Sequence, residues 1–207
     1  MKEETIGGRP YHHGDLRRGL IDAARRLLEC EGPSALSLRA VAREAGVSPA
    51  APYHHFKDKN ELLEAIAEQG WDLLGDMLAK ARIESGSNYG PLALVGVTYV
   101  RFAREHPALY RVMYDRSRDR EALPDRQHGH DGAYDRVRTA LVQAGLDPTD
   151  LVGLELAAVA AWSAAHGLAE MACFKQFQPL KDQLGGEEAF LRGVFEHMGI
   201  FAEGPKR

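Results

Sequence analysis

Apolar residues recur along this chain mostly at intervals of three and four, the spacing that places them on one face of an α-helix. Two short helices are predicted near the start. The first follows Asp15, which we expect to cap it, and it stops at Gly32 and Pro33. The second follows the capping residue Ser37 and ends at Gly46. The first part of the chain is therefore predicted to be helical with short connections.

A third, very short helix and a long fourth one are predicted next. Ser48 followed by Pro49 is typical of an N-cap with proline at the first helical position. Pro52 lies inside this third helix, where its missing N–H should tighten or distort the helix. Asp58 with Glu61 three residues later resembles a capping box, so a long fourth helix is expected to begin there.

The connection between the second and third helices has the composition of a helix-turn-helix. Ala42 is small enough to let the third helix approach the second, and Gly46 can adopt the positive φ that a sharp turn requires. Val47 and Phe56 are expected to fill the corner from the inside. An ordinary helical hairpin with a glycine turn is the alternative, and the turn alone does not decide between the two.

Helical patterns continue through the rest of the chain, so the predicted fold is all-α. Residues 115–132 are the exception, because they are rich in Asp, Arg and Gly and predict a solvated loop. The other predictions are a helix from Pro91 that breaks at His106-Pro107 into the next, a long helix that begins at the cap Asp147 and runs to about Phe174, and a final helix over 187–201.

Charge is distributed unevenly, which is more informative than the net charge of −4. Residues 5–59 carry nine Lys and Arg against six Asp and Glu, whereas residues 60–207 carry sixteen against twenty-two. A basic first segment followed by an acidic remainder indicates that only the first segment meets an anionic partner such as nucleic acid.

The composition predicts a cytoplasmic protein. Hydrophobic residues make up 44% of the chain and charged residues 27%, as in soluble globular proteins. The longest apolar run, over 156–169, falls short of the roughly 20 residues of a membrane span, and the first residues lack the apolar core of a secretory signal. Cys30 and Cys173 lie in apolar helical contexts and are expected to be buried thiols in a reducing compartment. His128 and His130 are better explained by a surface loop than by a metal site, and no metal or cofactor is predicted.

Two stretches resemble a known family. Residues 37–59, SLRAVAREAGVSPAAPYHHFKDK, contain a Tyr53-x-x-Phe56-x-x-Lys59 signature directly after the predicted turn. The longer stretch from Asp15 to Leu63, which includes these residues, resembles the DNA-binding domain of TetR-family transcriptional regulators. Residues 101–114, RFAREHPALYRVMY, together with Trp162, His166 and Gly167, resemble the WHG-type regulatory domain of one branch of that family.

The resemblance implies a helix-turn-helix DNA-binding domain over 1–60, joined by a long helix to a helical ligand-binding and dimerisation domain over 61–207. It also implies a homodimer that binds double-stranded operator DNA with an inverted repeat. A small-molecule effector would release the dimer, so the resemblance implies a repressor and no enzyme.

The resemblance carries over to DNA contacts residue by residue. The start of the third helix would enter the major groove, and polar residues around it would hold phosphates. The predicted contacts are Ser37, Arg39, Ser48, Ala50, Ala51, Tyr53, His54 and Lys59. The alternatives are a core position for Tyr53, a solvated cation for Lys59, and His55 in place of His54 as the phosphate partner.

The long helix after Asp147 presents two different faces. Trp162 and His166 share one of them, and we expect them to face a cavity with Tyr99 and Phe102 that suits a mostly apolar molecule with one polar group. A core with one hydrogen-bonded histidine is the alternative. Small residues on the other face would let a partner helix approach closely. The predicted dimer interface consists of Ala157, Ala160, Ala164, Leu168, Phe190 and Val194.

Two other functions remain open at this stage. In one of them, the protein would still bind DNA, but the second half of the chain would only dimerise and would bind no ligand. In the other, the protein would be a small helical enzyme in which His166 and either Glu155 or Glu170 form an acid–base pair. The sequence contains no nucleophile elbow, phosphate loop or spaced metal cluster in support of an enzyme.

Overall fold

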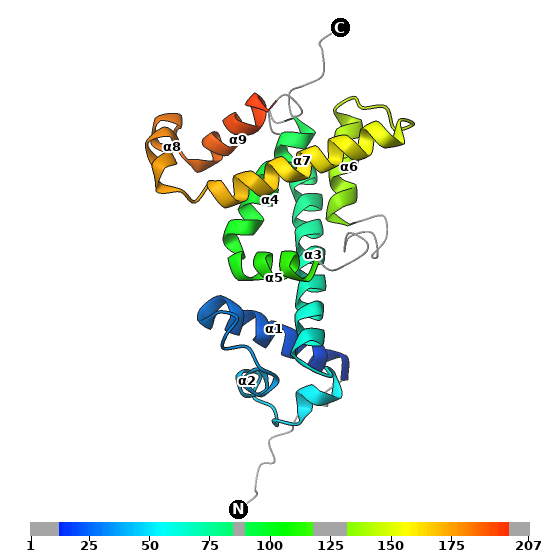
Figure 1. Cartoon of the computed structure of the whole chain (residues 1–207), viewed down its shortest axis with the longest axis vertical. Coiled ribbons are helices and arrows are strands. Elements are labelled where there is room, and N and C mark those ends of the chain that lie inside the picture. The colour runs from blue at the N-terminus through cyan, green and yellow to red at the C-terminus, as the bar shows by residue number, and fades with distance from the viewer. Residues whose placement is uncertain (1–12, 85–89, 118–131, 199–207) are drawn as a thin grey trace, which may run out of the picture. The chain divides into compact units, whose positions relative to one another are not determined.

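The computed structural model describes residues 13–84, 90–117 and 132–198, and every regular element within them is helical (Figure 1), which confirms the all-α fold. The chain forms two compact units, Met1–Ile66 and Ala67–Arg207, which we call the head and the body. The elements are α1 (His13–Glu31), α2 (Leu38–Glu44), the 3₁₀ turn η1 (Ala51–His54), α3 (Lys59–Glu84), α4 (Pro91–Glu105), α5 (Pro107–Ser117), α6 (Ala133–Gln143), α7 (Leu151–Met171), the 3₁₀ turn η3 (Lys175–Phe177), α8 (Gln178–Leu184) and α9 (Glu187–His197).

The turn between α2 and η1 forms as predicted. Ser37 has an extended backbone, and its hydroxyl oxygen accepts the N–H of Ala40 at 3.1 Å, so it caps α2. Gly46 has a φ of +69°, and the N–H of Val47 donates to the carbonyl of Ala42 at 2.9 Å. This is the glycine helix end in which a left-handed residue lets the chain reverse sharply.

Two helix starts in the head differ from the prediction. α1 already includes His13, so Asp15 lies inside the helix instead of capping it. η1 begins at Ala51 and not directly after Ser48, because Pro52 has no N–H to continue an α-helical ladder. The bonds from the N–H of Ala51 to Ser48 and of Tyr53 to Ala50 instead span three residues, so the predicted tightening by Pro52 is confirmed.

The start of α3 carries the predicted capping box. Asp58 accepts the N–H of Glu61 at 3.0 Å, and the carboxylate of Glu61 accepts the N–H of Lys57 at 2.6 Å. Beneath these caps the apolar faces of α1, α2 and the first turns of α3 form the core of the head. Its largest fully buried side chains are Leu20, Phe56, Leu62 and Ile66.

In the body, α4 is the central helix and packs against α5, α6, α7 and α9. Phe195 of α9 lies directly over Gly96 of α4, where an added Cβ would come within 2.6 Å of the ring. Glycine is therefore required for this approach of α9 to α4. The sequence patterns did not predict α6 and α8. In the structure α6 packs against α7, and α8 packs against α9.

α7 begins three residues later than predicted. Asp150 is the N-cap, and its side chain accepts the N–H of Gly153 at 2.9 Å. Asp147 instead accepts the N–H and the hydroxyl of Thr149, at 2.8 and 2.7 Å, which closes a turn before the helix.

By length and composition alone, α7 is apolar enough to cross a membrane, contrary to the prediction from apolar runs. Its buried side packs on α4 and α6 through small side chains such as Ala158 and Ala161, and it carries His166 into a polar cluster. These contacts are those of a core helix, and its opposite side lacks neighbours among the described residues.

The two cysteines are exposed, so the prediction of buried thiols is wrong. Cys30 lies two residues beyond the buried Leu28 on α1. At 100° per residue this places its side chain on the far side of the helix from the core. Cys173 lies just after α7, where its thiol contacts the carbonyl oxygen of Glu170 at 3.1 Å.

The cap assignment at α7 predicts a stability effect. Replacing Asp150 by Ala removes the acceptor for the Gly153 N–H, so the free energy of unfolding should fall by about 1 kcal/mol. Asp150→Ser, which keeps a capping oxygen, should recover most of the loss. Urea unfolding followed by circular dichroism measures both. A larger loss for Asp147→Ala than for Asp150→Ala would show that Asp147 is the cap.

Candidate nucleic-acid interface and aromatic network

The predicted DNA contacts lie at the surface of the head. Ser37, Arg39, Ser48, Ala50 and His54 are exposed, and Ala51 is half-buried. Tyr53 is 53% exposed, which rules out a core position for it. The four-residue turn η1 therefore presents a small set of side chains to solvent, and the capping residue Ser37 of α2 is exposed as well.

The residues next to these contacts hold η1 in place. Phe56 follows η1 and is fully buried, and the guanidinium carbon of Arg17 in α1 lies 5.3 Å from the centre of its ring. His54 is exposed while His55 is half-buried. Of the two histidines, His54 is thus the more accessible to a phosphate.

Lys59 has a structural partner that the sequence did not indicate. Its ammonium donates to the carbonyl oxygen of Pro33 at 3.0 Å, which ties the start of α3 to the loop before α2. An ammonium has two further N–H groups, and Lys59 remains exposed. The side chain can therefore brace the head and meet a phosphate at the same time.

The predicted cavity residues of the body are only partly brought together. Tyr99 and His166 meet, with the hydroxyl of Tyr99 3.2 Å from Nδ1, and the ring of Trp162 lies 5.3 Å from that of Tyr99. Phe102 is not among them, since it is fully buried with its ring beside His106. Tyr99 and Phe102 are three residues apart on α4, and among the described ring contacts Phe102 has only that with His106.

Two tyrosines of α5, Tyr110 and Tyr114, complete the cluster that the sequence only partly identified. The hydroxyl of Tyr110 lies 2.6 Å from Nδ1 of His166. The hydroxyl of Tyr114 is hydrogen-bonded to that of Tyr99 and accepts the indole N–H of Trp162 at 2.9 Å. We call Tyr99, Tyr110, Tyr114, Trp162 and His166 the aromatic network. Their signal in the sequence is the Tyr110-x-x-x-Tyr114 spacing, one helical turn, in the stretch that carries the second resemblance.

Burial keeps the members of the network uncharged. It raises the pKa of Tyr110 to about 12 and raises the pKa values of Tyr99 and Tyr114 further above the ordinary tyrosine range. Burial also lowers the pKa of His166 below 6.5, although the nearby Glu170 carboxylate acts in the opposite direction. The imidazole is therefore neutral, and we assign its proton to Nε2, so that Nδ1 accepts the hydroxyl of Tyr110.

Trp71 of α3 borders the aromatic network. Its ring centre lies 5.6 Å from that of Tyr114 and 5.9 Å from that of Trp162. The side chain is 7% exposed, and its indole N–H has no hydrogen-bond partner among the described residues. No motif or spacing in the sequence distinguishes Trp71 from the other apolar residues of its helix.

The acid–base pairs considered for an enzyme do not form in the described structure. Nδ1 of His166 is occupied by tyrosine hydroxyls, and Glu155 accepts the hydroxyl of Tyr134 at 2.9 Å. Glu170 is exposed and affects His166 through its charge. Within the described residues, no group of three or more His, Cys, Asp or Glu could hold a metal ion. His128 and His130 lie outside the described residues.

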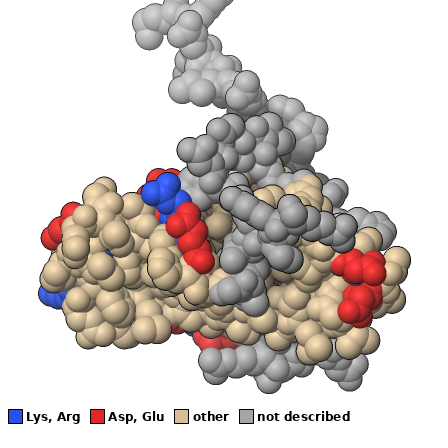
Figure 2. All heavy atoms as spheres, turned by 90° about the horizontal axis from the view of Figure 1, so that it is seen from above, with Lys and Arg blue, Asp and Glu red and all other residues tan. Residues whose placement is uncertain are grey.

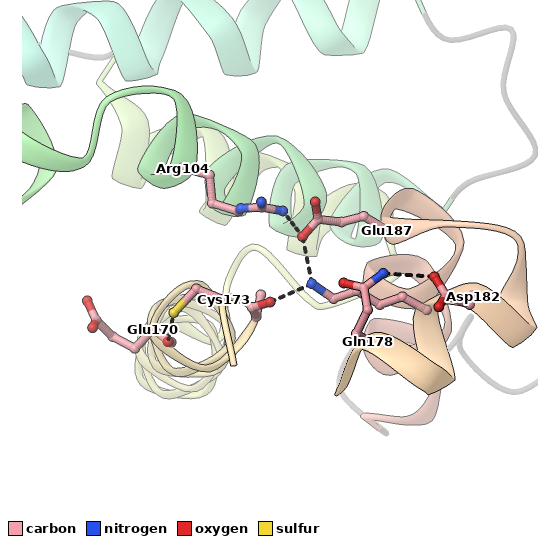
Figure 3. A network of polar contacts seen from close by, with 8 residues as sticks. Arg104, Glu170, Cys173, Gln178, Asp182 and Glu187 are labelled. Carbon is pink, nitrogen blue, oxygen red and sulfur yellow. Dashed lines mark hydrogen bonds and ion pairs between the residues drawn. The ribbon is translucent and has the colours of Figure 1, made fainter. Parts of the chain in front are cut away.

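The body also carries a charged hollow, which lies away from the aromatic network. It measures about 360 Å³, and α4 and α9 line it with Val97, Arg101, Arg104, Glu105, Glu187, Glu188 and Leu191. Glu187 is paired with Arg104 (Figure 3) and accepts from Lys181, a buried lysine of α8, at 3.2 Å. Lys181 also donates to the carbonyl of Ala172 at 2.6 Å. These contacts join α8 to the end of α7, the start of α9 and α4.

The predicted dimer residues are divided between core and surface. Ala160 is exposed, and Ala157, Ala164 and Val194 are half-buried. Leu168 and Phe190 are buried within a single chain, which leaves little of either side chain for contact with a partner. The exposed side of α7 lies about 100° around the helix axis from the side predicted to meet a partner, which corresponds to a shift of one residue.

Comparison with known proteins identifies the family of both units. Residues 20–66 match the family described as bacterial regulatory proteins of the tetR family, and residues 92–194 match the tetracyclin repressor-like C-terminal domain. A structure from Rhodococcus sp. RHA1, described as a protein with unknown function, is 32% identical with a TM-score of 0.69, and the match covers 90% of this chain and 94% of that one.

Two further solved structures have the same fold at lower identity. A TetR-family transcriptional regulator from Streptomyces coelicolor is 21% identical with a TM-score of 0.62, and 90% of this chain and 99% of that one are covered. A regulatory protein of the tetR family from Rhodococcus RHA1 is 20% identical with a TM-score of 0.60, covering 93% and 98%. With its helix-turn-helix head, its all-helical body and matches to both family domains, this chain belongs to the TetR family of transcriptional regulators.

Proposed function

We propose that the protein is a homodimeric repressor in the cytoplasm, which binds an inverted-repeat operator through its heads and leaves it when a small, mostly apolar molecule binds in the body. Family membership supports DNA binding. The observation that carries the proposal is the exposed surface of the head, where η1 and the capped start of α2 present Tyr53, His54, Ser37 and Arg39 to solvent. We assign no enzymatic activity and no cofactor.

The local geometry suits contact with the DNA backbone and close approach to bases. The oxygen of Ser37 accepts from Ala40, which leaves its O–H to donate to a phosphate oxygen. Ala50 and Ala51 have only a methyl group each, so they permit η1 to lie against base edges and can contact thymine methyl groups. The four-residue length of η1 limits the number of base contacts per head. Two heads would therefore be needed for specific recognition.

An arginine substitution tests the assignment of the DNA surface. Arg39→Ala should remove one phosphate contact per head, so the plot of log affinity against log salt should become less steep by about 0.9 for each head. Arg26→Ala is the control, because the side chain of Arg26 is already held by Glu44 at 2.9 Å. Electrophoretic shifts of the promoter DNA upstream of the protein's own gene measure both variants.

The outcome separates specific from nonspecific binding. Wild-type protein should prefer this DNA to a scrambled duplex at moderate salt, and Arg26→Ala should retain the wild-type slope. Equal affinity for the scrambled duplex would refute the proposed operator binding. An unchanged slope for Arg39→Ala would show that Arg39 of α2 does not contact the DNA backbone.

α7 offers the surface for a second copy. Val152, Leu156 and Val159 are 72%, 67% and 50% exposed, and they follow one another along one side of the helix. The exposed Ala160 and Ser163 continue the same side with small residues. We call Val152, Leu156, Val159, Ala160 and Ser163 the α7 stripe. Apolar side chains this exposed need a cover in a soluble protein.

A second copy of the chain is the occupant that fits. The small residues Ala160 and Ser163 at the end of the stripe permit a close helix crossing, and a two-fold axis through the crossing would bury the same side chains twice. Much of the face seen in Figure 2 carries no charged side chain among its described residues, with Asp, Glu, Lys and Arg in scattered small groups. Two copies also supply the two heads that an inverted repeat requires.

A charge in the α7 stripe tests this assembly. Leu156→Arg would bury an unpaired guanidinium between two chains, which costs several kcal/mol, so dimerisation should weaken roughly 100-fold or more. Operator affinity should fall with it. The control is Leu184→Arg on α8, where the side chain is 45% exposed and lies outside the stripe. Analytical ultracentrifugation and operator shifts measure both variants. A folded, fully dimeric Leu156→Arg protein would show that another surface forms the dimer.

A further inference from the structure

The aromatic network contains more hydrogen-bond donors than well-placed acceptors. Three hydroxyls and the N–H of Trp162 must share the hydroxyl oxygens and the single lone pair of Nδ1 in His166. Tyr110 lies closest to Nδ1, at 2.6 Å, and Trp162 donates to Tyr114. The hydroxyls of Tyr99 and Tyr114 are bonded to each other, and only one of them can be the donor in that bond.

One hydroxyl proton of this pair is therefore left without a good acceptor. If Tyr114 donates to Tyr99, the proton of Tyr99 can reach only the occupied Nδ1 at 3.2 Å or the oxygen of Tyr110 at 3.5 Å. If Tyr99 donates instead, the proton of Tyr114 has no acceptor within the network. Either direction leaves a weakly used donor in a buried place, which is energetically unfavourable.

Trp71 adds an independent donor at the same place. Its N–H is buried with no hydrogen-bond partner among the described residues, beside the rings of Tyr114 and Trp162. Buried N–H groups without a partner are rare in folded proteins and often mark a functional position. Two separate donors, one on α3 and one on the α4–α5 side, are thus left without a good acceptor beside the same group of rings.

The surroundings indicate what kind of molecule supplies the acceptor. Trp71, Trp162 and Tyr134 are close-packed aromatic rings, with 5.6 Å between the ring centres of Tyr134 and Trp162, and they suit a flat apolar body. The network contains no Lys or Arg, and the charges beside it are the carboxylates of Glu170 and Glu155. An anion would be desolvated without a counter-charge there. Trp162, His166 and Tyr114 are its half-exposed members, so they form the side of entry.

We propose that the effector is a flat, uncharged molecule with a carbonyl oxygen, which accepts hydrogen bonds from Trp71 and from the Tyr99–Tyr114 pair. This proposal rests on the proposed function, because it names the ligand class of the body. The carbonyl would satisfy donors that the protein alone leaves unused. Because Trp71 belongs to α3, whose first turns lie in the head core, the ligand would act on a helix that both units share.

A pair of probes of matched shape tests the acceptor directly. 2-Acetylnaphthalene and 2-isopropenylnaphthalene differ only in C=O against C=CH₂. Equilibrium dialysis against the full-length dimer should show the ketone binding roughly 3- to 10-fold more tightly, the range expected for one net hydrogen bond. The anion 2-naphthoate should bind more weakly than the ketone.

Substitutions then locate the donors. Trp71→Phe should bring the affinity ratio of ketone to alkene close to one, because it removes the N–H that only the ketone can use. A general loss of fit would instead weaken the binding of both probes alike and leave the ratio unchanged. Tyr99→Phe is the second variant and should also lower the ratio. Tyr53→Phe is the control, since it also removes one tyrosine hydroxyl but at an exposed residue of the head that is not part of the network. It should leave the ratio unchanged.

A spectroscopic signal distinguishes hydrogen bonding from packing. The ¹³C resonance of carbonyl-labelled 2-acetylnaphthalene should move downfield on binding and return towards its free position in Trp71→Phe. Equal affinities of ketone and alkene, tighter binding of naphthoate, or binding of neither probe would overturn the proposal. Specific operator binding by the same preparation would show that the proposed DNA function survives such a failure.

Discussion

The body of this protein depends on the polar contacts around one nitrogen, Nδ1 of His166, which lies 2.6 Å from the hydroxyl of Tyr110 and 3.2 Å from that of Tyr99. α7 is otherwise rich in alanine on its buried side, and small side chains alone permit several sliding positions of a helix. A buried donor or acceptor that loses its partner costs about 1–3 kcal/mol. The network therefore selects the one position of α7 against α4 and α5 in which the imidazole meets both hydroxyls.

The same network gives the body its chemical character. Burial keeps the phenols protonated and the imidazole neutral, so the core offers donors without a charge. One hydroxyl proton and the N–H of Trp71 are left poorly used or unused in that arrangement. In the proposed mechanism a ligand with an acceptor relieves this imbalance, and the free energy so gained is available to shift α3. The head contributes a rigid frame instead, fixed by the caps at Ser37 and Asp58 and by the bond from Lys59 to Pro33.

Sequence analysis succeeded where local physics decides and failed where tertiary packing does. The caps at Ser37 and Asp58, the left-handed Gly46 and the tightening at Pro52 follow from single residues and their neighbours, and all of them form. Trp162 and His166 both contact Tyr114 because one turn of α7 separates them. Phe102 was predicted to line the cavity with Tyr99. Which side of α4 meets α7 depends on the helices packed around α4, and the sequence pattern of α4 alone does not show it. The exposed side of α7 was misjudged for the same reason, since apolar and small residues occur on both sides. Trp71 has no distinguishing pattern in the sequence.

The most direct test of this account is the protonation state of His166, observed by ¹⁵N NMR of the imidazole in the full-length protein. The account predicts a neutral ring at pH 7 with Nε2 protonated and Nδ1 showing the shift of a hydrogen-bond acceptor. Since burial lowers the folded-state pKa below 6.5, the ring should remain neutral somewhat below that pH, and stability should decline as the pH falls below 6.5. A protonated Nδ1 at pH 7, or titration above pH 6.5, would contradict the assignment on which the ligand proposal depends.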